Sequence, residues 1–314
     1  MKSSYFSFKG REDTKINVYK WEPDKEQDIK AIIQISHGMA ETANRYEELA
    51  SYLSEAGYIV YANDHRGHGK SALSLDQLGY LGEEDGFMSM VEDVHTLNTI
   101  IKEENKGLPV FLLGHSMGSF ISQRYIQLYG QELNGVILVG TNGNQGPLIN
   151  MGILVAKLEM KFKGRRHKSN LLNNLSFGGY NKKFEPNRTE FDWLTRDEKE
   201  VDKYIKNEYC GAIFPTSFYH DFLKGLKSIW KEENKNKIPI NLPIFIIAGD
   251  KDPVGNFGKG ILNLYNFYKS IGVVDVNYKL YKEGRHEILN EINKREVFQD
   301  VLNWIDSKYN KTIK

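Results

Sequence analysis

The sequence has little of what marks secreted, membrane-spanning or nucleic-acid-binding proteins. Cys210 is the single cysteine in 314 residues, so no internal disulfide can form, and we expect a protein of a reducing compartment, the cytoplasm. The first residues lack the apolar core of a secretory signal, and no apolar run is long enough to span a membrane. The 42 basic and 41 acidic residues leave a net charge of +1, which provides no general attraction for nucleic acid.

Short apolar runs alternate with helical periods over much of the chain. The apolar runs lie at 31–35, 58–62, 110–113, 135–139, 244–248 and 276–281. Runs of this kind are typical of parallel strands covered on both faces. Two alternating segments near the start, 5–8 and 15–21, predict an antiparallel hairpin. The sequence therefore predicts an α/β fold with a mostly parallel, eight-stranded sheet flanked by helices.

The alternation of strands and helices lapses after Thr141 and resumes near Pro243. The interval contains helix-compatible stretches, such as 151–160 and 198–209, and it is too long for a structureless connection. We therefore expect a core made of residues 1–143 and 236–314. Residues 144–235 are expected to form a helical cap inserted into that core.

Ser116 is the candidate nucleophile. It lies in the segment Gly114-His115-Ser116-Met117-Gly118, which follows a predicted strand and precedes a predicted helix. In this G-x-S-x-G pattern the glycines permit a sharp turn that presents the serine at the end of the strand. The helix directs its first amides at the place where negative charge develops. A glycine-rich turn without chemistry is the alternative, and the flanking elements argue against it.

A serine hydroxyl needs a histidine base and an acid that orients the base. In the α/β-hydrolase fold these follow the serine in the order acid then histidine, on loops after late strands. His286 follows the strand predicted at 276–281 and is the candidate base. Asp250 and Asp252 both follow the strand predicted at 244–248. The position of Asp252, farther beyond the strand, favours it only mildly, and either aspartate could simply form a turn.

The second oxyanion donor is expected after the strand predicted at 31–35. That strand ends in His37-Gly38, where this fold takes a backbone amide for the oxyanion hole. We expect the N–H groups of Met39 and Met117 to be the two donors. A further glycine-containing segment, 64–71, lacks the spacing of a phosphate-binding loop, so we expect a structural role for it. No histidine pair has metal-ligand spacing, and no metal or cofactor is expected.

Taken together, these segments resemble the monoacylglycerol lipase and lysophospholipase group of α/β-hydrolases, which includes serine aminopeptidase-like sequences. The matching segments follow one another along nearly the whole chain: 37–41 with Arg45-Tyr46, 64–71, 114–118, 249–254 and 285–287. The resemblance implies that the acid is Asp252, which precedes Pro253-Val254, and it supports Met39 and Met117 as oxyanion donors. One departure is Ala40, where eukaryotic members usually have a glycine.

The cap is expected to contact the substrate. Its apolar stretch at 148–160 could line an acyl pocket or pack on the core. Phe214 and Phe218 are candidate substrate contacts, and the resemblance adds Cys210, for which a small buried hydrophobe is the alternative. A basic cluster at 157–168 could make transient contact with a membrane surface, a solvated helix face being the alternative.

These observations and the resemblance imply a serine hydrolase that cleaves monoacylglycerols, lysophospholipids or similar single-chain acyl esters through an acyl-enzyme intermediate. The first alternative is an amidase or aminopeptidase, which would need an acidic site in the cap, with Glu185, Glu190 and Asp192 as candidates. The second is a non-catalytic binding protein of the same fold. The expected partner is a small acyl ester and not nucleic acid, and the oligomeric state is not predicted.

Overall fold

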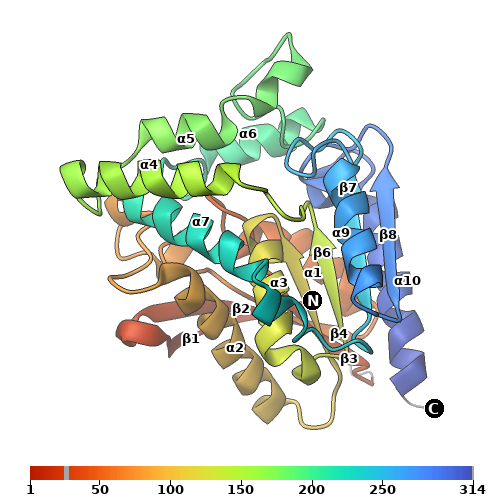
Figure 1. Ribbon diagram of the computed structural model, residues 1–314. Helices are drawn as coiled ribbons and strands as arrows, with labels where there is room; N and C mark the ends of the chain where they lie inside the picture. The colour runs from red at the N-terminus through yellow and green to blue at the C-terminus, as the bar shows by residue number, and fades with distance from the viewer. Residues whose placement is uncertain (25–27, 313–314) are drawn as a thin grey trace.

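The computed structural model describes residues 1–24 and 28–312, and its strands form one mixed sheet (Figure 1). The eight strands are ordered β1-β2-β4-β3-β5-β6-β7-β8. Only the β1–β2 hairpin and the β2–β4 pair are antiparallel, and all other neighbours are parallel. The strand bounds are β1 Lys2–Lys9, β2 Lys15–Glu22, β3 Ala31–Ser36, β4 Tyr58–Asn63, β5 Val110–His115, β6 Gly135–Val139, β7 Ile244–Gly249 and β8 Val276–Tyr281. The predicted fold class is confirmed.

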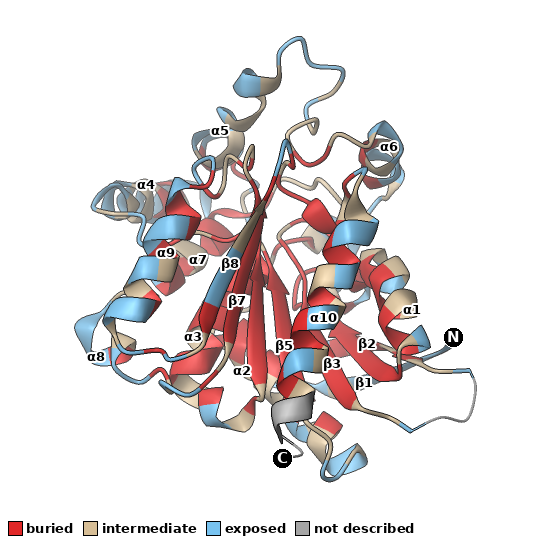
Figure 2. Cartoon of the chain, turned by 90° about the vertical axis from the view of Figure 1, so that its right-hand side faces the viewer, coloured by how far each residue is buried: buried red, intermediate tan, exposed pale blue. Residues whose placement is uncertain are grey.

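Helices cover both faces of the sheet (Figure 2). On one face lie α1 (Glu47–Glu55) and α10 (Lys294–Thr312), and on the other lie α2 (Gly86–Glu104), α3 (Met117–Tyr129) and α9 (Lys259–Ser270). Side chains of β3 alternate between the two cores, because successive residues of a strand point to opposite faces. Every residue of β3 to β7 is therefore buried, which explains their continuous apolar runs.

Five helices separate β6 from β7 in the chain. They are α4 Leu148–Lys163, α5 Asn170–Phe177, α6 Glu198–Lys206, α7 Thr216–Ile229 and α8 Glu232–Lys235. The first three lie above the ends of the strands, whereas α7 packs between α4 and the core helices α2 and α3 (Figure 1). The division into a core and a cap at residues 144 and 235 stays a prediction. No helix in the described ranges is both long and apolar enough to cross a bilayer.

Short 3-10 helices complete the connections: Arg11–Asp13, Ala43–Tyr46, Gly69–Ser71, Leu75–Gln77, Gly130–Glu132, Tyr180–Phe184 and Ile288–Asn290. The segment 64–71 has structural contacts. Arg66 is buried and binds Asp93 of α2 through Nε at 2.7 Å and Nη2 at 2.9 Å. The N–H of His65 donates to Nε2 of His37 at 2.9 Å, which fastens this segment to the loop after β3.

Three histidines, His37, His65 and His68, form a buried cluster beneath that loop. Their ring centroids are 4.4 to 6.4 Å apart. Burial is the main cause that lowers the pKa of each, well below its usual value for His65 and to about 3 for His68. The cluster is therefore neutral in the folded protein at neutral pH, because charging any member would place an ion in a site without water.

This burial predicts loss of stability in mild acid. As the pH falls below about 6.5 the unfolded chain gains protons on these histidines and the folded chain does not, so unfolding becomes easier. His115, whose pKa is raised, has the opposite effect only above about pH 6.5. We expect the free energy of unfolding to fall by about 1 kcal/mol for each of the three histidines between about pH 6.5 and 5.5, as measured by urea denaturation.

A matched pair of variants checks the cause of this acid lability. His68→Asn should reduce the pH dependence by roughly a third, because it removes one buried titrating ring. Thr99→Asn, at an exposed position of α2 without a titrating group, should leave the slope as in the wild type. A wild-type stability that does not change over this pH range would contradict the prediction.

Candidate active site

Ser116 sits at a sharp, strained turn between β5 and α3. Its φ of 51° and ψ of −117° lie outside the regions that ordinary residues occupy. The turn is possible because glycines flank it. A Cβ on Gly114 would lie 2.3 Å from Ser122 Oγ, and one on Gly118 would lie 1.9 Å from the carbonyl oxygen of Ser36. The two glycines are therefore required by close packing, and the turn leaves Ser116 partly exposed.

His286 is paired with Asp252, and both side chains are buried. Nδ1 of His286 lies 3.0 Å from Oδ1 of Asp252, which also accepts a hydrogen bond from the N–H of Val254 at 2.8 Å. Asp250 faces elsewhere, because its Oδ1 accepts the N–H of Glu283 at 2.8 Å. Of the two aspartates that the spacing left open, the structure thus brings Asp252 to the imidazole.

Ser116 and His286 line one cavity of about 400 Å³, a volume within the usual range for small-molecule sites. The cavity lies between the carboxyl ends of the central strands and the helices of the interval 144–235. Within the described residues no hydrogen bond joins Ser116 Oγ to His286. Such contacts are commonly long in ligand-free sites and shorten when substrate binds.

The loop after β3 lies directly against the turn at Ser116. A Cβ on Gly38 would be only 3.3 Å from the Cβ of Ser116, so the loop can approach this closely only with glycine there. Met39 follows Gly38 and lines the cavity. Met117 is the first residue of α3, and the N–H groups of a helix's first turn have no partner within the helix. The expected oxyanion donors therefore flank the turn on both sides.

Ala40 occupies a left-handed conformation, with φ of 54°. This conformation favours glycine, so the alanine is held there against its local preference. The carbonyl oxygen of Ala40 accepts hydrogen bonds from the Tyr204 hydroxyl at 2.9 Å and from the N–H of Gly211 at 3.0 Å. The interval 144–235 thereby holds the loop in its strained shape, although the residue is not glycine.

This arrangement of a strand, a sharp serine turn, a helix, a late aspartate and a late histidine agrees with the comparison with known proteins. A family model described as Hydrolase_4, serine aminopeptidase S33, matches residues 27–293. The chain belongs to this hydrolase family.

Two curated relatives and one solved structure place the hydrolase among lipases and esterases. It is 29% identical over 311 residues to a monoacylglycerol lipase of Mycolicibacterium smegmatis, covering 97% of each chain. It is 26% identical over 288 residues to a phospholipase of Bacillus subtilis, covering 90% of this chain and 96% of the relative. A carboxyl esterase of Bacillus coagulans is 30% identical, with a TM-score of 0.90 over 98% of this chain and 99% of that chain. The hydrolase is of the monoacylglycerol lipase-like group of α/β-hydrolases.

The apolar wall of the cavity differs from the one expected. Its apolar side chains are Met39, Phe177, Phe191, Trp193, Leu194, Ala212 and Ile213. Phe214 and Phe218 are fully buried and pack edge-on to His68, so they lie behind this wall. The structure thus places Phe214, just before helix α7, and Phe218, within that helix, in the core, and direct contact of either with substrate stays a prediction.

Cys210 and the apolar side chains of α4 also lie away from the cavity lining. Burial raises the pKa of the Cys210 thiol to about 12, so the thiol stays protonated and packs as a small apolar group. Met151, Leu154 and Leu158 of α4 are 65%, 55% and 46% exposed. The expected acyl pocket thus does not come from α4, because the helix turns these side chains to solvent.

Trp193 is a site residue that the sequence reasoning did not single out. Its ring lies 5.1 Å from that of His286 between centroids, and its carbonyl oxygen accepts the N–H of His286 at 3.4 Å. Phe177 stacks on the other side of Trp193 at 6.1 Å. A contact between the cap and a loop that is 93 residues later leaves no periodic signal in the sequence.

Two further histidines, His95 and His220, have structural partners. His95 stacks on Tyr129, and His220 contacts Asp221 through Nδ1 at 2.8 Å. In residues 1–24 and 28–312, no three histidine, cysteine, aspartate or glutamate side chains gather as ligands for a metal ion.

Proposed function

We propose that this hydrolase is a serine esterase that cleaves uncharged, single-chain acyl esters such as monoacylglycerols through an acyl-enzyme intermediate. The observation that carries the proposal is the buried Asp252–His286 pair, which shares one cavity with the strained, partly exposed Ser116. The pairing of acid and imidazole is what a serine nucleophile requires for activation. The lipase and esterase relatives support an ester as the substrate.

In the proposed mechanism, Ser116 Oγ attacks the ester carbonyl while His286 Nε2 accepts the hydroxyl proton. Asp252 holds the other imidazole nitrogen as a donor and stabilises the imidazolium that forms. The negative charge on the carbonyl oxygen is bound by the N–H groups of Met39 and Met117. The imidazolium then protonates the departing alcohol, and a water molecule repeats the sequence on the acyl-enzyme to release the fatty acid.

The charge of the cavity lining supports an uncharged head group. Its charged side chains are the carboxylates of Glu41, Glu190 and Glu287, and no lysine or arginine is found among the lining residues that the structure describes. Glu41 and Glu287 are bound by the buried Arg45, whereas Glu190 is exposed at the cavity without an ion pair within the described ranges. A phosphodiester would meet an uncompensated carboxylate, so we favour glycerol esters over lysophospholipids.

Glu190 also bears on the amidase or aminopeptidase alternative, since a free carboxylate could bind a substrate amine. Asp192 cannot do so, because its carboxylate accepts hydrogen bonds from Thr189 and the N–H of Arg188. Hydrolysis of amino-acid amides faster than acyl esters would decide for the alternative. A wild-type protein without turnover on either class would instead be a binding protein. A cytoplasmic location stays a prediction based on the single cysteine.

The cap also has a surface that fits an anionic membrane, and we propose transient contact there. Met151, Leu154, Leu158 and Phe162 form an exposed apolar stripe along one side of α4, at helical spacing. Lys157 and Lys161 are exposed beside it, whereas Arg165 and Arg166 of the basic cluster bind Glu83 of the core instead. Apolar side chains flanked by lysines are typical of helices that lie in a membrane interface.

The assignment of the acid is tested by exchanging the two aspartates for asparagine. Asp252→Asn should lower kcat on p-nitrophenyl butyrate by about 10³-fold or more, because the imidazole loses the group that fixes its tautomer. Asp250→Asn, in the same loop, should stay within about threefold of wild type. Ser116→Ala should abolish both turnover and labelling by a fluorophosphonate. An Asp252→Asn variant with more than a tenth of wild-type kcat would argue against this triad.

The head-group preference is tested by reversing the charge at the cavity. Glu190→Lys should raise the ratio of kcat/KM for lysophosphatidic acid to that for monoacylglycerol by about fivefold or more, since a charge contact of this kind contributes about 1 kcal/mol. Glu185→Lys makes the same charge change elsewhere in the cap and should alter the ratio less than twofold. Equal ratios for the two variants would show that the charge of Glu190 does not set the head-group preference.

Membrane contact is tested by sedimentation with vesicles of phosphatidylcholine and phosphatidylglycerol. The double variant Met151→Ser/Leu158→Ser should lower the bound fraction more than tenfold, because each buried apolar side chain contributes about 1.5 kcal/mol or more. Leu73→Ser removes a leucine that is 78% exposed outside the cap, and it should have no effect. Equal recovery of wild-type protein in the pellet with and without vesicles would exclude the contact.

A further inference from the structure

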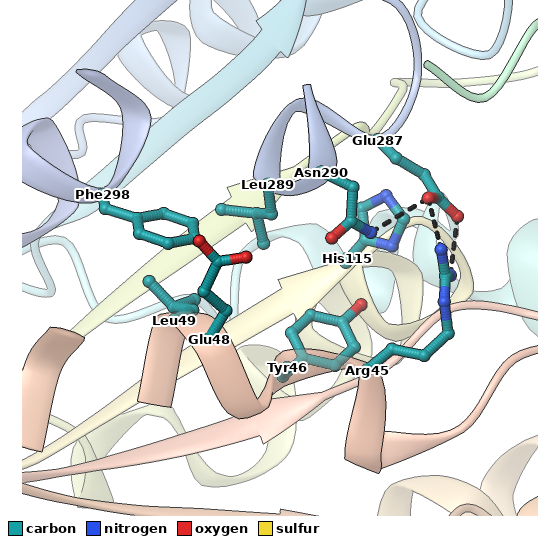
Figure 3. A pocket seen from close by; sticks show the side chains of 9 residues that line it. All are labelled: Arg45, Tyr46, Glu48, Leu49, His115, Glu287, Leu289, Asn290 and Phe298. Carbon is teal, nitrogen blue, oxygen red and sulfur yellow. Dashed lines mark hydrogen bonds and ion pairs between the residues drawn. The ribbon is translucent and has the colours of Figure 1, made fainter. Parts of the chain in front are cut away.

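A cluster of buried charged side chains lies at one side of the cavity, and we call Glu41, Arg45, His115 and Glu287 the Arg45 cluster. Figure 3 shows Arg45, His115 and Glu287 of this cluster. The side chains of Glu41, His115 and Glu287 are 3 to 5% exposed, and that of Arg45 is 11% exposed. Charged groups are kept this far from water only when they are paired. The proposed mechanism uses none of these four side chains.

Arg45 binds both carboxylates of the cluster at once. Its Nη1 lies 2.6 Å from Glu41 Oε2 and 2.8 Å from Glu287 Oε1, and its Nη2 lies 2.6 Å from Glu287 Oε2. Burial by itself lowers the pKa of Arg45, but the charges of Glu287 and Glu41 raise it well above its usual value. Burial likewise raises the pKa of Glu41, but Arg45 and His115 hold it well below its usual range. Arg45 and Glu41 are therefore both ionised at neutral pH.

The two carboxylates belong to the two loops that hold proposed catalytic groups. Glu41 Oε1 accepts the N–H of Gly38 at 2.6 Å, next to the proposed oxyanion donor Met39. Glu287 directly follows His286, and the N–H of Glu287 donates to the carbonyl oxygen of Leu194 at 2.6 Å. Arg45 thus bridges a loop after β3 to a loop that is 242 residues away in the chain.

His115 adds a contact between the cluster and the imidazole of His286. Its Nδ1 lies 3.1 Å from Glu41 Oε1, and its ring centroid lies 4.9 Å from that of His286. On the other side, the Arg45 guanidinium lies 4.9 Å from the ring of Tyr204, whose hydroxyl binds Ala40. The cluster therefore contacts the oxyanion loop, the residue before Ser116, the base and the cap.

We propose that Arg45 is a positioning residue, which holds the oxyanion loop and the His286 loop in register by binding Glu41 and Glu287 simultaneously. The proposal rests on the serine mechanism above. The planar guanidinium suits this task, because its fork of donors can bind two carboxylates in fixed directions. A lysine would keep the charge but would offer a single point of attachment. Arg45 itself touches neither substrate nor the reacting atoms.

The test compares Arg45→Lys with Arg66→Lys. Both exchanges remove a buried guanidinium–carboxylate contact, but that of Arg66 is with Asp93 of α2, away from the cavity. We expect both variants to melt at lower temperature than the wild type. Only Arg45→Lys should lower kcat on p-nitrophenyl butyrate, by about tenfold with KM within twofold, because small displacements of catalytic groups slow the chemical step. Equal kcat for Arg45→Lys and wild type would overturn the proposal.

A double-mutant cycle with Glu41→Gln and Glu287→Gln provides a second readout that does not need Arg45 to be replaced. If both carboxylates act through Arg45, the double variant should lose at least threefold less kcat than the product of the two single losses. Fully multiplicative losses would overturn the proposal. These isosteric variants also serve if Arg45→Lys does not fold.

The behaviour of the wild type distinguishes failure of the Arg45 proposal from failure of the proposed function. If the wild type hydrolyses the ester and labels at Ser116 with a fluorophosphonate, the serine mechanism holds whatever the Arg45 variants do. If neither occurs in the wild type, the proposed function fails before any variant is compared.

Discussion

Close contact between backbone segments at the carboxyl edge of the sheet is the constraint on which the rest of the site depends. A Cβ on Gly118 would lie 1.9 Å from the carbonyl oxygen of Ser36, and one on Gly249 would lie 1.9 Å from that of Gly284. Loops after four different strands can therefore meet only where glycine leaves room. These backbone contacts fix the distances between Ser116, the oxyanion loop and the loops that hold Asp252 and His286.

Buried ion pairs also hold these loops together. Arg45, Glu41 and Glu287 form a buried network that joins two of those loops. Taking three ionised groups out of water is costly, and such a group is tolerated only when every member is bound. Beneath the same loop, burial keeps the cluster of His37, His65 and His68 uncharged, in contrast to the charged Arg45 network. The folded state therefore combines charged and uncharged buried groups within one region.

The interval 144–235 supplies most of the side chains that surround the cavity. Trp193 and Phe177 build the apolar wall over His286, whereas Glu190 brings negative charge to the cavity. Tyr204 and Gly211 hold Ala40 in a left-handed conformation that favours glycine. For the proposed reaction, substrate preference would thus depend on the interval 144–235, which supplies most of the apolar lining of the cavity.

The sequence by itself determined the positions of the strands and the order of the candidate catalytic residues along the chain, because both depend on local patterns. Apolar runs gave the bounds of β3 to β8 to within two residues, and the glycines around Ser116 predicted its turn. Spacing left Asp250 and Asp252 open, and resemblance rather than physics favoured Asp252 until their contacts were known. The orientation of side chains in the interval 144–235 could not be predicted from local patterns. Phe214 and Phe218 face the core, and α4 exposes Met151, Leu154 and Leu158. The Arg45 cluster joins positions that are 242 residues apart. Such contacts are made between elements, and periodicity within an element contains no information about them.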